Sequence, residues 1–309
     1  MPMGRIARAA RQALAWVRMP HTASAFANRH RHDDRMEISC TDELPPLPPT
    51  PPPQRTGDPV PALRASVGII VVYFALQFAV SLLFGAAIAA TAALRSSGAG
   101  IETAIRTTLA QPAMQALLAI LSLGVAAPLT LWLVRRSWPA LWPQAQPPGF
   151  GFVPPRQPLF FALAVLVGLA APFLGALLTE WLAHGHTVTQ DIQQIGSSTP
   201  LGLRLPLVLV VVGVGPLVEE LLFRGVLLSA LIKRWPVGWA VAGSSLLFAL
   251  VHLPGLDYQW YALPNLLLLA LLLAGLRLRS GSIWPAVLAH GVNNLLAVAV
   301  WFVAINPPG

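Results

Sequence analysis

The residues best suited to chemistry are a few charged and polar side chains inside strongly apolar segments. Glu219 and Glu220 fall within the apolar stretch 206–232, and Arg224 follows them. A charge at the centre of a membrane helix costs roughly 2.5 to 3.5 kcal/mol on insertion scales, so it needs a partner or a function. Glu220 and Arg224 stand four residues apart and can pair on one helix face, whereas Glu219 points about 100° away from Glu220. We therefore expect Glu219 to meet a group from another helix.

Two histidines and one asparagine are the other candidates. Among the seven histidines, His252 and His290 are the two that lie in apolar segments. Phe248 precedes His252 by one helical turn and can pack against its ring, and Asn294 follows His290 by one turn on the same face. A carboxylate can take a proton from water, neutral imidazoles can orient that water, and an amide can stabilise an oxyanion. These residue types together suit peptide hydrolysis.

The same side chains are also candidates for a metal site. Glu219, His252 and His290 are two histidines and a glutamate, which is a ligand set of catalytic zinc. The compact His-Glu-x-x-His helix is absent, so the ligands would come from three separate helices. The single cysteine, Cys40, provides no thiolate cluster. The spacing is compatible with two alternatives, a water held without metal and a water bound to zinc.

Membrane-spanning helices must position these residues. The 309-residue chain is 55% hydrophobic and 10% charged, whereas soluble domains carry about 25% charged residues. Its apolar stretches are close to the ~20 residues that a helix needs to cross a bilayer. We predict an all-α polytopic transmembrane helix bundle of about seven spans, with eight as the alternative, in an integral membrane protein of the bacterial inner membrane. The predicted spans are 66–93, 114–134, 158–180, 206–232, 237–253, 262–278 and 283–304.

Basic residues indicate the orientation of the bundle. They occur in the N-terminal tail and in alternate loops, which by the positive-inside rule places the N-terminus in the cytoplasm. Segments 96–111 and 184–200 then form loops on the outer side. This distribution explains the net charge of +8 without nucleic acid as a partner. The basic residues that carry the prediction are Arg64, Arg135, Arg136, Arg156, Lys233, Arg234, Arg277 and Arg279.

Composition divides the chain into three parts. Residues 1–62 are a basic, Pro-rich cytoplasmic tail that we expect to be disordered, with a basic membrane-surface helix near its start as the alternative. Residues 63–157 hold two N-terminal transmembrane helices and a linker. Residues 158–309 form the bundle that contains all the candidate site residues.

Three motifs in this bundle resemble those of the CAAX protease and bacteriocin-processing family of intramembrane endopeptidases, also called the CPBP or Abi family. The resemblance covers the C-terminal third to half of the chain. It implies that Glu219 activates the attacking water with help from His252, and that Glu220 and Arg224 are a supporting pair. It also implies a membrane-associated or hydrophobic peptide as substrate, and that His290 and Asn294 stabilise the oxyanion or take part in metal binding. The motifs are Glu219-Glu220-x-x-x-Arg224, Phe248-x-x-x-His252 and His290-x-x-x-Asn294.

Other hypotheses fit parts of the pattern. A non-catalytic immunity or binding protein with the same fold would retain the buried polar network without turnover. A small proton-coupled transporter would use Glu219 as a relay in a helix broken after Pro216. The charges could also serve only to hold helices together. A rhomboid-like serine site at Ser244-Ser245 is the least supported, because the Gly-x-Ser pattern is only loosely met.

Overall fold

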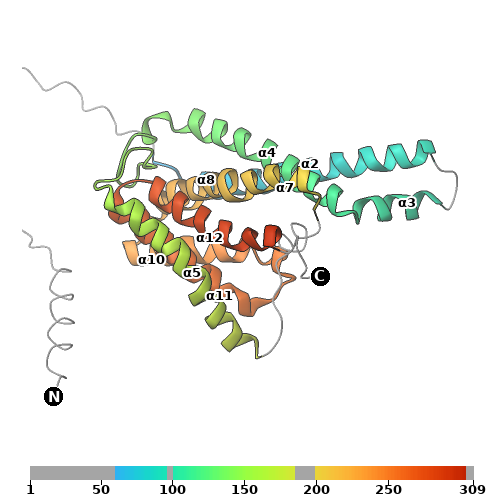
Figure 1. Ribbon diagram of the computed structural model, residues 1–309. Helices are drawn as coiled ribbons and strands as arrows, with labels where there is room; N and C mark the ends of the chain where they lie inside the picture. Colours follow the sequence, from blue (N-terminus) through green and yellow to red (C-terminus); the bar gives the residue numbers. More distant parts are fainter. Residues whose placement is uncertain (1–59, 96–99, 185–198, 304–309) are drawn as a thin grey trace, which may run out of the picture. The chain divides into compact units, whose positions relative to one another are not determined.

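The computed structural model describes residues 60–95, 100–184 and 199–303, and within these ranges the chain forms helices joined by turns, without β-strands (Figure 1). The predicted tail, apart from residues 60–62, and most of the predicted 184–200 loop lie outside the described residues. Five described helices are long and apolar enough to cross a membrane. They are α2 (Leu63–Arg95), α4 (Pro112–Ser137), α5 (Leu159–Ala183), the helix Leu201–Ile232, and the segment Trp260–Ser280 that contains α11 (Leu263–Ser280).

Two further helices complete the apolar part of the chain. α10 (Val237–Val251) is shorter than a typical span, and α12 (Trp284–Val303) carries the last motif. The all-helical membrane fold is thus confirmed. The count of seven spans and the cytoplasmic N-terminus stay predictions.

The prediction of a loop at 96–111 is wrong in part, because a short helix, α3 (Gly100–Leu109), occupies it. Ile101, Ile105 and Leu109 recur every four residues and give this helix an apolar face, and α3 contacts α2 and α4. α2 has 33 residues and is therefore about 50 Å long, which exceeds a ~30 Å hydrocarbon core. α3 packs against this long helix (Figure 1).

The first motif lies on one continuous helix that contains two π-helical segments. It runs through α7 (Leu201–Val208), η2 (Leu209–Val214), α8 (Gly215–Glu220), η3 (Leu221–Leu227) and α9 (Leu228–Ile232), where η2 and η3 are π-helical. At the ends of the π segments, Gly215 N–H donates to Val210 O and Leu228 N–H donates to Phe223 O, each five residues back. The expected break after Pro216 is therefore absent. Wide π turns flank the two glutamates instead, as often happens at functional sites.

This π-containing helix, residues 201–232, lies between two groups of helices. α2 and α4 pack together on one side, whereas α5, α11 and α12 pack against one another, and α10 contacts α11 and η3 (Figure 1). Close approach of α5 to α12 depends on Gly168. A Cβ there would lie 2.6 Å from Ala289 O, well inside van der Waals contact.

Arg277 anchors the linker between α4 and α5 to the end of α11. Its guanidinium is buried and donates to Ala145 O and Gly149 O, both at 2.7 Å. Gly151 has a φ of +78°, and a Cβ at that position would meet Arg277 Cζ at 2.7 Å. This arginine of the basic loop set therefore holds backbone carbonyls inside the protein.

Candidate active site

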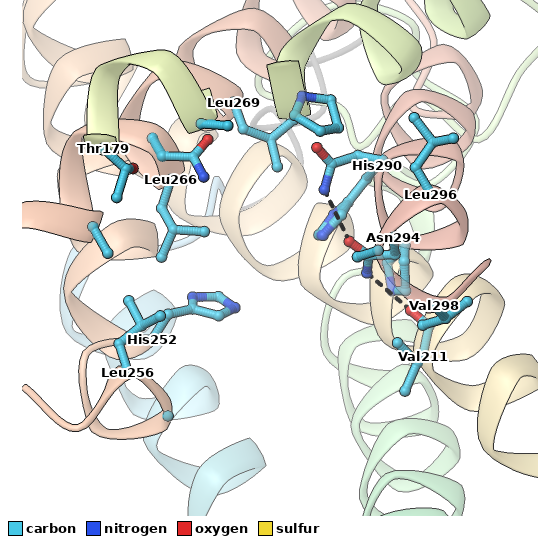
Figure 2. A pocket seen from close by; sticks show the side chains of 18 of the residues that line it. Thr179, Val211, His252, Leu256, Leu266, Leu269, His290, Asn294, Leu296 and Val298 are labelled. Atoms are coloured by element: carbon cyan, nitrogen blue, oxygen red, sulfur yellow. Dashed lines mark hydrogen bonds between the residues drawn. The ribbon is translucent and has the colours of Figure 1, made fainter. Parts of the chain in front are cut away.

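Glu219, His252 and His290 come together although they belong to three separate helical elements. Glu219 Oε2 lies 3.7 Å from His252 Nε2 and 3.8 Å from His290 Nε2. These distances exceed those of direct hydrogen bonds, 2.7–3.2 Å, so the three groups face one another around a small gap. Figure 2 shows both histidines at the same pocket, one from the end of α10 and the other from α12.

His290 is held from behind by the second glutamate. Its Nδ1–H donates to Glu220 Oε1 at 3.0 Å, and the same oxygen accepts from Arg224 Nη1 at 2.9 Å. Arg224 Nη2 donates in addition to Ala270 O at 3.2 Å. Glu220 and Arg224 are both completely buried. The pair therefore links α12, the π-containing helix and α11, and it fixes the His290 ring.

His252 is held by its own helix and by a phenylalanine ring. Its Nδ1–H donates to Phe248 O at 2.7 Å, and the imidazole packs on the Phe248 ring with centroids 4.6 Å apart. The Phe248 ring also contacts the Arg224 guanidinium, whose Cζ lies 4.3 Å from the ring centroid, and the His290 ring, whose centroid is 5.7 Å away. Phe248 thus packs against both histidines and against the supporting arginine.

These contacts decide which ring nitrogens carry a proton. The Nδ1 atoms of His252 and His290 face a carbonyl and a carboxylate, which can only accept. Each Nδ1 must therefore be the donor, and in a neutral ring the Nε2 atom is then an unprotonated acceptor. Both of these acceptors point at Glu219 Oε2.

Asn294 is positioned through the gap that a proline leaves in the π-containing helix. Gly215 N–H donates to Val210 O, so the next bond in this π pattern would join Pro216 to Val211 O. Proline has no N–H, and Asn294 Nδ2 donates to Val211 O instead, at 2.9 Å. Asn293 Nδ2 donates to Asn294 Oδ1 at 3.2 Å, so both ends of the Asn294 amide are held (Figure 2).

The gap between Glu219 and the histidines opens into a cavity of about 1100 Å³. Its lining is mainly apolar, with polar side chains contributed by α5, α11 and α12. Sequence reasoning assigned none of the lining residues from α5 and α11 to the site, because they belong to no motif. The apolar lining includes Leu123, Pro172, Phe173, Leu266, Leu269 and Leu296, and the polar lining outside the three converging residues includes Thr179, Glu180, Asn265, Asn293 and Asn294.

The donor atoms around Glu219 Oε2 are spaced more widely than the ligands of a zinc ion. Tetrahedral zinc at 2.0–2.1 Å from each ligand places ligand atoms roughly 3.4 Å apart, which is closer than the 3.7 and 3.8 Å separations around Glu219 Oε2. Over residues 60–95, 100–184 and 199–303, no group of three or more His, Cys, Asp or Glu side chains is arranged to hold a metal ion. The present arrangement of Glu219, His252 and His290 does not fit zinc.

The serine alternative gains nothing from the geometry. Ser244 is buried and its Oγ donates to Phe223 O at 2.8 Å. Ser245 is also buried, and neither serine belongs to the cavity lining. The two hydroxyls lie in the packed interior rather than at the site.

The fold and the site together define a class: an integral membrane protein of α-helices with a carboxylate and two imidazoles at one apolar cavity. Comparison with known families then gives one match. A family model described as type II CAAX prenyl endopeptidase, Rce1-like, matches residues 201–296, about a third of the chain. The matched segment contains all three motifs and confirms the resemblance to the CAAX protease family. No curated protein and no solved structure matched the chain.

Proposed function

We propose that the protein is an intramembrane endopeptidase that hydrolyses a peptide bond of a membrane-associated or hydrophobic peptide through a water activated by Glu219. The observation that carries this proposal is the convergence of His252 Nε2 and His290 Nε2 on Glu219 Oε2 at 3.7 and 3.8 Å. The family match supports endopeptidase activity in general. The water mechanism is our own proposal.

The three acceptor atoms suit a single water molecule placed between them. Glu219 Oε2 and one Nε2 atom would accept its two protons and leave an oxygen lone pair free to attack a carbonyl carbon. When the C–O bond forms, the proton moves to Glu219. As the C–N bond breaks, this proton is delivered to the leaving amine. Water is thereby split into the hydroxyl of the new carboxyl end and the proton of the new amino end.

The surroundings of the site favour this chemistry. Low polarity in the cavity strengthens the interaction between Glu219 and the developing charges. Asn294 Nδ2 donates one of its two hydrogens to Val211 O. The second hydrogen is left to donate to the substrate carbonyl oxygen as that oxygen becomes negative. The supporting pair of Glu220 and Arg224 keeps the His290 ring in place without taking part in proton transfer.

The apolar lining favours a hydrophobic substrate over a soluble peptide. Leu266, Leu269 and Leu296 line the cavity from α11 and α12, and Phe173 lines it from α5. A peptide that enters must exchange contact with lipid or water for contact with these side chains. Apolar side chains next to the scissile bond gain from this exchange, whereas charged ones lose hydration.

The test is cleavage of a library of hydrophobic peptides in nanodiscs, followed by mass spectrometry. We expect the wild type to cut selected peptides and Glu219→Ala and His290→Ala to cut none. Glu102→Ala is the matched control, because the Glu102 side chain is 75% exposed on α3, and it should cut as the wild type does. Cleavage that survives both site changes would contradict the assignment. Proton-coupled flux that depends on Glu219, without cleavage, would favour the transporter hypothesis.

A further inference from the structure

Tyr73 is a buried polar residue on α2 that belongs to none of the three motifs and lies outside the segment 201–296. Its side chain is 1% exposed, and its hydroxyl has no hydrogen-bond partner among the described residues. Tyrosine hydroxyls that are buried usually find a partner, because an unpaired one loses its hydration without replacement. The position of Tyr73 relative to the site explains why this hydroxyl is there.

The register of α2 against the π-containing helix brings Tyr73 to the level of Glu219. Ser66 Oγ donates to Val226 O at 3.5 Å, which fixes one point of contact. The two helices run in opposite directions (Figure 1). Seven residues forward from Ser66 and seven residues back from Val226 each correspond to roughly 10 Å. Ile70 and Tyr73 follow Ser66 at helical spacing and are buried on the same face.

The electrostatic interaction between the two residues agrees with this register. Glu219 is the charged residue whose field acts on the Tyr73 hydroxyl. The groups that act on Glu219 are His252, His290 and Arg224. Both histidines face Oε2, so Oε1 is the oxygen that a donor from α2 can hold.

We propose that Tyr73 is a positioning residue whose O–H reaches Glu219 Oε1 through one bridging water. This role depends on the proposed function of Glu219 as the general base. A hydrogen bond to Oε1 keeps Oε2 directed at the histidines and favours the charged carboxylate, which is the form that can accept a proton. α2 is then part of the catalytic unit, although it lies outside the segment that the family model matches.

The first test is Tyr73→Phe, which removes the hydroxyl and keeps the ring. We expect kcat to fall about tenfold, as for loss of a hydrogen bond to a charged group, with KM unchanged. The acid limb of the kcat/KM profile should move to higher pH, because the carboxylate has lost a donor that favoured its charged form. The matched control is Thr130→Val, since Thr130 on α4 also has a completely buried hydroxyl without a partner among the described residues.

The control variant should keep the wild-type kcat and acid limb. An acid limb that stays in place in Tyr73→Phe, or that moves equally in Thr130→Val, would overturn the proposal.

The second test needs no turnover and therefore separates this proposal from the proposed function. Infrared difference titration follows the Glu219 carboxylate band, with Glu219→Gln as the background. Tyr73→Phe should raise the pH midpoint of that band. An unchanged midpoint refutes the contact even in a protein that cuts peptides. A raised midpoint in a protein that cuts nothing supports the contact and counts against the peptidase.

Discussion

Replacing Arg224 with methionine removes the cation from a pair whose side chains are 1% and 0% exposed. Glu220 would then keep only the His290 Nδ1–H as a donor, and Ala270 O would lose its bond from Arg224 Nη2. Removing one member of a buried ion pair costs about 3–5 kcal/mol, because the remaining charge stays buried without compensation. We expect a loss of this size in the free energy of unfolding of Arg224→Met.

The chain offers a matched control for this change. Arg106 and Glu102 on α3 have the same four-residue spacing and the same 2.9 Å nitrogen–oxygen distance, but their side chains are 78% and 75% exposed. Arg106→Met should cost only a few tenths of a kcal/mol, because solvent screens the exposed pair. Unfolding by added sodium dodecyl sulfate in mixed micelles, followed by circular dichroism, measures both variants.

A double replacement protects the experiment against a variant that simply fails to fold. Glu220→Gln combined with Arg224→Met leaves no buried charge in the pair, so it should recover most of the stability lost by Arg224→Met alone. Equal losses in Arg224→Met and Arg106→Met would refute the account of this pair. So would a double variant that is no more stable than Arg224→Met.

Three further predictions concern helix packing at Gly168, the side-chain amide of Asn294 and a bound metal ion. Gly168→Ala should lower the free energy of unfolding by about 1–3 kcal/mol through overpacking against Ala289 O. Gly124→Ala, where no atom lies within 4 Å of the added Cβ, should leave the free energy of unfolding unchanged. Equal effects of the two changes in chemical denaturation would contradict this packing. Asn294→Leu leaves Val211 O without its donor and should lower kcat about a hundredfold; wild-type kinetics would exclude the oxyanion role. Chelator treatment should leave cleavage unchanged, and loss of cleavage with recovery on adding zinc would favour the metal mechanism.

Much of the fold follows from the cost of placing polar groups in lipid. Long apolar stretches indicate α2, α4 and α5 directly, because only a helix satisfies its backbone hydrogen bonds within one span. The same cost singles out Glu219 and Glu220, since charges inside an apolar stretch need a partner. Spacing of four residues predicts the contact of Glu220 with Arg224, which the structure contains at 2.9 Å.

Contacts between distant residues could not be predicted in this way. The bond from His290 to Glu220 joins residues 70 positions apart, and it depends on how α12 packs against the π-containing helix. Tyr73 carries no motif, so only the register of α2 connects it with the site. Periodicity along one helix cannot supply such information.

Two local features of the helices, the partner of Val211 O and the helix α3, could not be predicted from the sequence either. Pro216 signals a carbonyl without its usual donor, but the sequence does not say that Asn294 replaces it. The stretch 96–111 lies between two predicted spans and is expected to be an outer loop, although the apolar residues of α3 do recur at helical spacing. Both cases show local signals whose meaning depends on the neighbouring helices.

The proposed function depends on Glu219 as the general base for peptide hydrolysis. Its most direct test is the kcat of Glu219→Gln on a peptide that the wild type cuts, measured at equal amounts of folded protein in nanodiscs. Glutamine keeps the shape of the side chain but cannot accept the proton, and general-base catalysis contributes roughly 10²–10⁴-fold. We expect kcat to fall at least about a hundredfold. Cleavage by Glu219→Gln at a rate close to that of the wild type would contradict it.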